Sequence, residues 1–194
     1  MKPTVFRSKF ALVVAYVWFA FAFVNAVDLV LRGRDAYALL GGAILLAFTV
    51  AIYLTCFRPR IVAGDEGVQV HNPFRDAFIP WSAVDDITVS HSIRISAGET
   101  VVRSWTPQTS SKERRQALRK GVATKPGLKE RDAESFRGVT HADWVARQLS
   151  EFAVSRRPKK GDTAAAKVAW SPVAVGLSLA SLALLAVSIV AVLV

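Results

Sequence analysis

The sequence offers few side chains whose types and spacing suit catalysis. The adjacent carboxylates Asp85 and Asp86 could act as general acid and base only if both faced one substrate. They stand in an alternating apolar and polar stretch that predicts a strand, where neighbouring side chains point to opposite faces. Ser82 and Ser104 have no histidine beside them in a recognisable nucleophile motif. We therefore expect no catalytic residues and no enzymatic activity.

Residues that could bind a metal or a cofactor are equally isolated. His71, His91 and His141 lack the spacing of metal ligands. Cys56 is the only cysteine, so the chain cannot form an internal disulfide, and it is expected to pack as a small hydrophobe. Gly41-Gly42 lies within a long apolar run, which favours close helix packing over phosphate binding. We expect no metal and no cofactor.

Positive charge is the most prominent chemical feature of the chain. Residues 58–167 hold 20 Lys and Arg against 13 Asp and Glu, and residues 112–137 hold 9 against 4. Each basic side chain near an anionic membrane surface contributes about 1 kcal/mol of attraction. The residues expected to contact anionic lipid headgroups or a partner are Arg114, Arg115, Arg119 and Lys120. The alternative is that these basic residues belong to a solvated loop and contact neither lipid nor a partner. Without interleaved aromatic residues or a groove-reading motif, we expect no nucleic-acid partner.

Three apolar runs are each long enough to cross a bilayer core about 30 Å thick. They cover residues 10–31, 36–57 and 168–194, and the third carries no charge. The first run has a competing interpretation as a signal peptide, because Val24-Asn25-Ala26 resembles a small-residue cleavage site. The short link to the second run favours a helical hairpin instead.

Basic residues flank these runs mainly on one side, which predicts the orientation of the chain. They are Lys2, Arg7, Lys9, Arg58, Arg60, Arg156, Arg157, Lys159, Lys160 and Lys167. The hairpin tip carries Arg32 and Arg34, partly offset by Asp35. We therefore expect a multi-pass protein of the cell (plasma) membrane, with its N-terminus and middle domain cytoplasmic. The basic residues from Arg156 to Lys160 are explained by their effect on membrane orientation alone. The alternative is that they also contact lipid headgroups.

The middle of the chain has the pattern of a small antiparallel β domain that ends in one helix. Period-two alternation or β-rich composition predicts strands over residues 61–63, 68–71, 77–81, 87–95 and 100–105. A helix is expected over 141–155, with Thr140 as its N-cap, Asp143 in its first turn and Val139 against Trp144. The residues expected in the core are Ile79, Trp81, Ile87, Val89, Trp144, Leu149 and Phe152.

The run RPRIVAGDEGVQVHNPFRDAFIPWSAVDDITV, residues 58–89, resembles the opening of the bacterial PH-domain proteins found as small membrane proteins in actinobacteria. The shared features are Arg-Pro-Arg after a span, a hairpin with glycine in its turn, a strand ending in Asn-Pro, and Ile-Pro-Trp before the next strand. Two N-terminal spans followed by a PH-like domain also match that family's layout. Some members are described only as low-molecular-weight antigens.

The resemblance implies a fold of α-helical transmembrane segments plus a small α+β PH-like domain. In that domain an antiparallel curved sheet or partial barrel carries a C-terminal capping helix. The expected parts are a transmembrane hairpin at 1–57, the PH-like domain at 58–157 with a basic insertion at 106–137, a basic linker at 158–167 and a transmembrane helix at 168–194. The third span and the insertion depart from the simplest form of the family. The resemblance therefore does not decide between a complete and a partial barrel.

From these features we expect a non-catalytic, membrane-anchored PH-like interaction or scaffold module on the cytoplasmic face. Its partners would be anionic lipid headgroups or an unidentified membrane or cytoplasmic protein. The alternative is an accessory subunit of a membrane complex that acts through its transmembrane helices. In that case the small residues Ala43, Ala47 and Ala51 would pack against partner helices.

Overall fold

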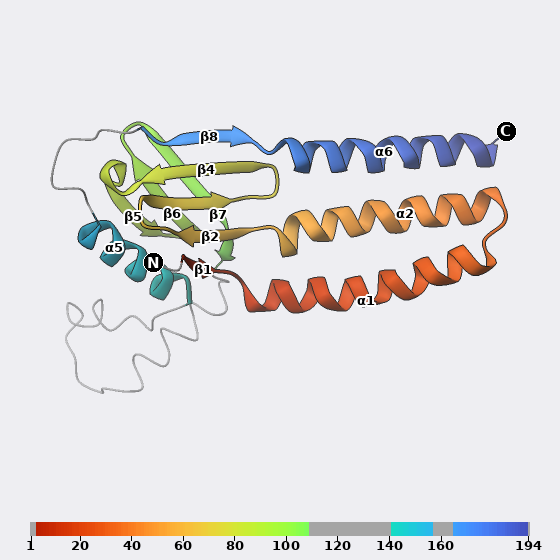
Figure 1. Ribbon diagram of the computed structural model, residues 1–194, viewed down its shortest axis with the longest axis horizontal. Helices are drawn as coiled ribbons and strands as arrows, with labels where there is room; N and C mark the ends of the chain where they lie inside the picture. Colours follow the sequence, from red (N-terminus) through yellow and green to blue (C-terminus); the bar gives the residue numbers. More distant parts are fainter. Residues whose placement is uncertain (1–2, 109–140, 157–164, 194) are drawn as a thin grey trace. The chain divides into compact units, whose positions relative to one another are not determined.

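The computed structural model describes residues 3–108, 141–156 and 165–193 (Figure 1). The chain divides into two units, which are treated separately below. The sheet unit comprises Met1–Arg7, Arg60–His71 and Ala77–Val168. The helical unit comprises Ser8–Pro59, Asn72–Asp76 and Ala169–Val194.

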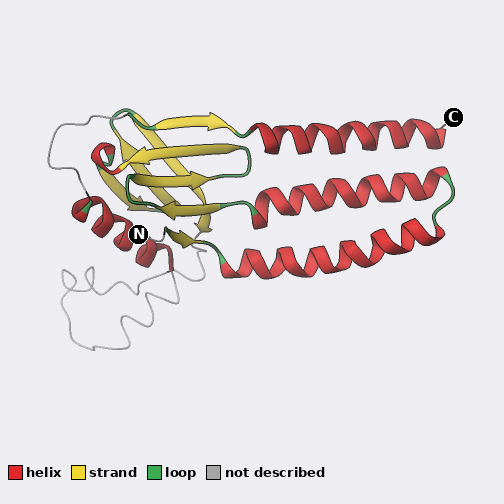
Figure 2. Ribbon diagram, in the orientation of Figure 1, coloured by secondary structure: helices red, strands yellow, loops and turns green. Residues whose placement is uncertain are grey.

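Three long helices form most of the helical unit (Figure 2). They are α1 (Lys9–Arg32), α2 (Ala36–Ile52), which continues as the π-helical turn η1 (Tyr53–Phe57), and α6 (Pro172–Leu193). Lys9–Arg32, Ala36–Phe57 and Pro172–Leu193 are each long and apolar enough to cross a membrane. Most of their large apolar side chains are exposed, which suits helices whose solvent is lipid.

The link between α1 and α2 is fixed by local hydrogen bonds and one glycine. Asp35 caps α2 by accepting a hydrogen bond from the Ala38 amide at 2.8 Å. The Gly33 amide donates to the Leu29 carbonyl at 2.8 Å, which closes the last turn of α1. A Cβ atom at Gly33 would lie 2.5 Å from that carbonyl oxygen and 2.7 Å from the Ala38 Cβ. Only glycine therefore fits this tight connection.

Small residues are buried where α2 packs against its neighbours. Ala43 is buried on α2, and the buried residues of α6 are Ala174, Ser181 and Ser188. A spacing of seven keeps them on one face, which favours a shallow crossing of two helices. The Ser181 and Ser188 hydroxyls donate to carbonyls of their own helix, so neither polar group is left unsatisfied in an apolar environment.

The sheet unit contains two sheets and the helix α5 (His141–Ser155). One sheet has the order β1-β2-β3-β4-β8 and the other β5-β6-β7. The strands are β1 (Thr4–Phe6), β2 (Arg60–Ala63), β3 (Gly67–His71), β4 (Arg75–Pro80), β5 (Asp86–Val89), β6 (Ser92–Ala97), β7 (Thr100–Gln108) and β8 (Lys167–Trp170). Strands β1, β2 and β3 pair antiparallel, as do β5, β6 and β7.

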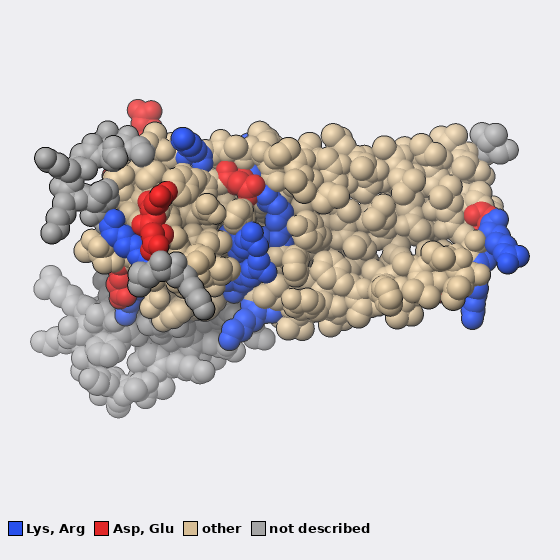
Figure 3. All heavy atoms as spheres, in the orientation of Figure 1, with Lys and Arg blue, Asp and Glu red and all other residues tan. Residues whose placement is uncertain are grey.

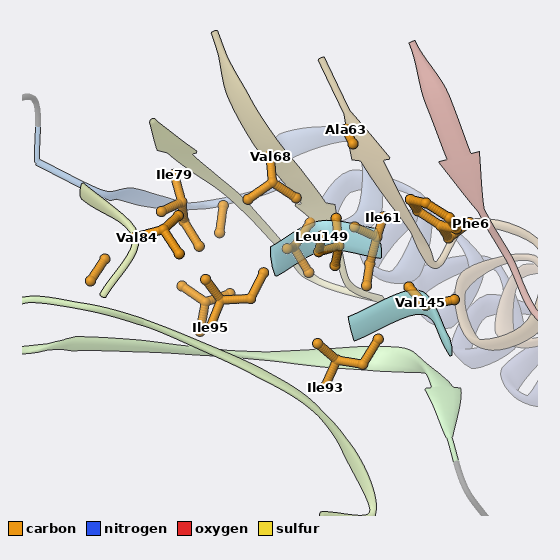
Figure 4. Close-up of a cluster of buried hydrophobic side chains, with 14 of the residues drawn as sticks. Phe6, Ile61, Ala63, Val68, Ile79, Val84, Ile93, Ile95, Val145 and Leu149 are labelled. Carbon is orange, nitrogen blue, oxygen red and sulfur yellow. The ribbon is translucent and has the colours of Figure 1, made fainter. Parts of the chain in front are cut away.

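The core of the sheet unit contains side chains from both sheets and from α5 (Figure 4). Ile61 and Val68 come from the first sheet and Ile95 from the second, while Val145 and Leu149 come from one face of α5. All five are at most 1% exposed. Burying aliphatic side chains of this size contributes about 1.5–3 kcal/mol each, so α5 is an integral part of this unit.

These observations confirm the expected fold class, an antiparallel sheet domain with a C-terminal helix beside helices long enough to cross a membrane. One predicted strand is wrong in detail. The stretch 87–95 forms a hairpin of β5 and β6 around the turn at Ser90-His91. Val89 pairs with Ile93 and Ile87 with Ile95, so the odd-numbered side chains stay on one face. A hairpin and a single strand thus give the same period-two pattern here.

The other differences lie at element ends. Residues 168–170, expected to begin the third span, belong to β8, and the helix begins at Pro172. Proline suits the first helical position because it has no amide hydrogen to leave unsatisfied. Residues 106–108, expected in the basic insertion, extend β7. Strand β1, which precedes α1, has no counterpart in the sequence prediction. Thr140 and Val139 lie outside the described residues.

Candidate functional site

Charged and aromatic side chains gather in the helical unit where the chain leaves α2 and where it enters α6. We call this group the junction cluster. Its members are Arg58, Phe74, Arg75, Asp76 and Trp170. Three of them belong to the short segment 72–76, which runs from the end of β3 into the first two residues of β4 and is part of the helical unit. The Asn72 amide donates to the Arg75 carbonyl at 2.8 Å and closes this segment into a turn.

Arg58 connects the end of α2 to this turn. Its Nη2 atom donates to both carboxylate oxygens of Asp76, at 2.8 and 2.6 Å. Its Nη1 atom donates to the carbonyls of Asn72 and Pro73. The Arg58 side chain is only 12% exposed and that of Asp76 38%. A guanidinium group presents several donors in a planar fork, so one side chain can hold a carboxylate and two carbonyls together.

The same turn is bonded to the start of α6. The Ser171 amide donates to the Phe74 carbonyl at 2.8 Å. The Arg75 guanidinium carbon lies 4.6 Å from the centre of the Trp170 ring, a cation–π contact. Trp170 is nevertheless 61% exposed. One turn therefore ties two of the apolar helices together, through the Arg58 hydrogen bonds on the α2 side and through Ser171 and Trp170 on the α6 side.

The ends of α1 and α2 near this cluster carry further aromatic rings. Phe57 stacks on Tyr53 with ring centres 5.7 Å apart, and meets Tyr16 edge-on at 6.0 Å. Tryptophan, tyrosine and arginine at the ends of apolar helices are typical of the membrane–water interface. Between these ends and the hairpin tip, Figure 3 shows a helical surface without Lys, Arg, Asp or Glu. The junction cluster thus has the chemistry of a membrane-surface contact.

In the sheet unit, Trp81 joins the core to the turn between β2 and β3. It is 1% exposed, and its Nε1 atom donates to the Gly64 carbonyl at 3.1 Å. Arg156, at the end of α5, donates to the same carbonyl and lies 3.8 Å from Asp65. Its guanidinium carbon is 4.5 Å from the centre of the Phe152 ring. Arg156 therefore holds α5 against this turn, which sequence reasoning did not anticipate.

The other residues predicted for the core differ in how far they are buried. Ile79 and Leu149 are fully buried, while Ile87, Val89 and Phe152 are partly buried against the cluster. Trp144 is 47% exposed, so its assignment to the core is wrong. Its ring meets Phe6 edge-on at 6.0 Å and stacks on His141. The buried face of α5 contains Ala142, Val145, Ala146 and Leu149, and Trp144 borders it.

Arg114, Arg115, Arg119 and Lys120, the predicted contacts for lipid or a partner, lie outside the described residues, as do Arg157, Lys159 and Lys160. Across the ranges that the structure describes, no group of three or more His, Cys, Asp or Glu side chains is arranged to hold a metal ion.

Residues 58–121 match the family described as Bacterial PH domain. The match begins at Arg58 of the junction cluster and includes β2 to β7. The chain contains a bacterial PH domain. This confirms the resemblance seen in residues 58–89, while the likeness to actinobacterial antigens stays a prediction. No curated protein and no solved structure matches the chain. PH domains are in general non-catalytic interaction modules, and that general description applies to this part of the chain.

Proposed function

We propose that this protein is a membrane-anchored, non-catalytic interaction module whose PH domain works at the cytoplasmic face. The observation that supports this most directly is the junction cluster. There, the first residue of the PH-domain match bonds a turn of the domain to the end of an apolar helix. A ligand-binding module coupled to helices in this way is held permanently at the membrane surface.

The charge distribution supports the proposed orientation. Lys9 and Arg58 stand at one end of the helical hairpin, while Arg32 and Arg34 at the tip are accompanied by Asp28 and Asp35. An excess of Lys and Arg near cytoplasmic ends of spans is the strongest general determinant of membrane orientation. In the sequence, the basic segment 112–137 lies between α2 and α6 and holds 9 basic residues against 4 acidic ones.

We assign partner recognition to this basic segment. The partner is an anionic lipid surface or a protein with an acidic face, since both attract clustered guanidinium and ammonium groups. The alternative, a subunit acting through its helices, places Ala43 against a partner. Ala43 is buried against this chain's own helices, whereas Ala51 is exposed. The face that the alternative needs is therefore already partly occupied.

The test is a crosslinking pull-down from native membranes with the intact chain and with a variant lacking residues 109–137. Starting the deletion at 109 keeps β7 whole. A matched variant replaces Arg114, Arg115, Arg119 and Lys120 with Gln and keeps the segment's length. A partner lost from both variants supports recognition by these charges. A partner recovered equally from all three proteins contradicts it.

A fourth protein, with its spans replaced by unrelated apolar helices, separates the two candidate functions. Retention of the partner supports the PH domain as the recognition element. Loss of the partner, with membrane insertion unchanged, supports the accessory subunit.

A further inference from the structure

A groove with a volume of about 540 Å³ lies between α1 and α2. Ala22 is buried at its floor, and Gly42 provides no side chain on the facing helix. Phe23, Val30 and Leu46 are exposed at its rim. Small residues at the floor and bulky ones at the rim make a slot that opens to the surroundings of the helices.

No polar group in the lining of the groove needs a hydrogen bond from an occupant. Its one hydroxyl, on Thr49, donates to the Leu45 carbonyl at 2.7 Å and accepts a hydrogen bond from Trp18 Nε1 at 3.1 Å. The remaining lining residues are apolar or glycine. A plain hydrocarbon chain therefore satisfies the site completely.

The dimensions of the groove favour a lipid chain over another helix. Its lining on α1 runs from Phe19 to Val30, about 18 Å along the helix axis. A helix of that length is about 10 Å across with its side chains and has a volume of about 1,400 Å³, so less than half of it could lie inside the groove. In a bilayer the surrounding medium is itself acyl chain, so an open apolar slot fills with hydrocarbon.

Charge at the hairpin tip points to the headgroup. Arg32 is paired with Asp28 at 3.2 Å, and Asp35 is engaged in capping α2. Arg34 is exposed and makes no ion pair within the described part of the chain. It follows the end of α1 by two residues, directly beyond the lining residues Leu29 and Val30. Among the described residues, one guanidinium group without an ion-pair contact thus stands at the end where a lipid phosphate would lie.

We propose that this groove binds one acyl chain of an anionic phospholipid from the leaflet at the hairpin tip, with the lipid phosphate against Arg34. The site rests on the membrane anchoring proposed above. It is distinct from the basic segment 112–137, which belongs to the part of the chain between β7 and α5.

The test measures lipid retained by the full-length chain after purification in mild detergent, using native mass spectrometry. The probes are phosphatidylglycerol and phosphatidylcholine with identical acyl chains. The intact chain is expected to retain phosphatidylglycerol about fivefold better, the preference that one unpaired basic group gives. Arg34→Gln should remove the preference for phosphatidylglycerol over phosphatidylcholine, while the protein still retains lipid through the acyl chain.

Ala26→Phe places a ring in the groove and should lower retention of both lipids about tenfold. The matched control is Ala20→Phe, on an exposed position of the same helix that does not line the groove, and it should behave as the intact chain. Equal retention by Ala26→Phe and Ala20→Phe overturns the proposal. Loss of self-association with unchanged lipid retention in Ala26→Phe also overturns it, in favour of a helix from a second copy.

Alkaline carbonate extraction of membranes keeps this proposal separate from the proposed function. If the intact chain is extracted, membrane anchoring itself fails. If it stays in the membrane but shows no preference for phosphatidylglycerol, only the lipid site fails.

Discussion

The sheet unit and the helical unit use apolar residues in opposite ways. In the sheet unit, large side chains such as Ile61, Ile95 and Leu149 are fully buried. In the helical unit, large side chains such as Phe23 and Val30 are exposed, and the buried residues of α1, α2 and α6 are small, including Ala43 and Ser188. Composition alone would describe both units as hydrophobic, yet the forces that stabilise one unit differ from those that stabilise the other.

The membrane anchoring that we propose accounts for this difference, because it places the helical unit in lipid and the sheet unit in water. In water, removing large apolar side chains from contact with solvent drives folding, at about 25 cal/mol per Å². In lipid this gain disappears, because acyl chains are as apolar as leucine, and helices associate through close packing and hydrogen bonds. Small buried residues are therefore the mark of a unit that belongs in a bilayer, and large buried ones mark a unit surrounded by water.

The largest effect is expected from Trp81→Ala in the sheet unit. The change empties a large core volume and removes the hydrogen bond to the Gly64 carbonyl, so the free energy of unfolding should fall by about 3–5 kcal/mol. Urea unfolding of the full chain in micelles, followed by near-ultraviolet circular dichroism, measures this. Val101→Ala, at an exposed position of β7, is the control. Equal losses in the two variants would show that Trp81 is not a core residue.

Arg58→Ala should have the next largest effect, confined to the junction cluster. It leaves the half-buried Asp76 carboxylate without its main partner, at a cost of about 1.5–3 kcal/mol. Amide hydrogen exchange in residues 72–76 should speed up accordingly. Arg75→Ala removes only the contact with Trp170 and should cost about 0.5–1 kcal/mol. If both variants exchange alike, the Arg58 bonds do not hold the turn.

Ala43→Leu should destabilise the helical unit by about 1–3 kcal/mol, because the larger side chain overfills a buried contact. Ala51→Leu, at an exposed position of the same helix, should change stability very little. Thermal denaturation in micelles, followed by helix content, compares the two. A larger loss from Ala51→Leu would mean that Ala51, and not Ala43, faces a helix.

The smallest effect is expected from Thr49→Val, which removes the acceptor for Trp18 Nε1 between α1 and α2. Hydrogen bonds between membrane helices contribute about 0.6 kcal/mol on average. The same denaturation assay should therefore show a loss near its detection limit. A loss as large as that of Trp81→Ala would contradict the contrast between the two units.

How much the sequence could predict depends on whether a signal is local. The three helices, strands β2, β3, β4 and β7, and α5 follow from apolar runs and from periodicity, so their existence was predictable. Strands β5 and β6 share one period-two pattern and were predicted as a single strand. Strand β1 was not, because three residues, Thr4 to Phe6, are too short to show a period. Strand β8 was not, because Val168 and Trp170 continue the apolar composition of the helix that follows.

The candidate site was less predictable than the fold. Arg58 and Asp76 are 18 residues apart, and no local pattern pairs them. The same holds for Arg156, whose partner Gly64 is 92 positions away. The misplacement of Trp144 has a simpler cause. Successive helical residues are about 100° apart around the axis. A predicted apolar stripe that is shifted by one position therefore includes a residue from the edge of the buried face. The end of a strand at Asn72-Pro73, by contrast, was visible in the sequence, because these residue types favour turns.

The central claim is that the helices anchor the PH domain at the cytoplasmic face. The most direct test labels single cysteines with a membrane-impermeant maleimide in a Cys56→Ser background. Tyr37→Cys reports on the hairpin tip and Ser155→Cys on the end of α5, and both positions are exposed. We predict that Tyr37→Cys is labelled in intact cells and that Ser155→Cys is labelled only after the membrane is permeabilised. Labelling of Ser155→Cys in intact cells would contradict the account.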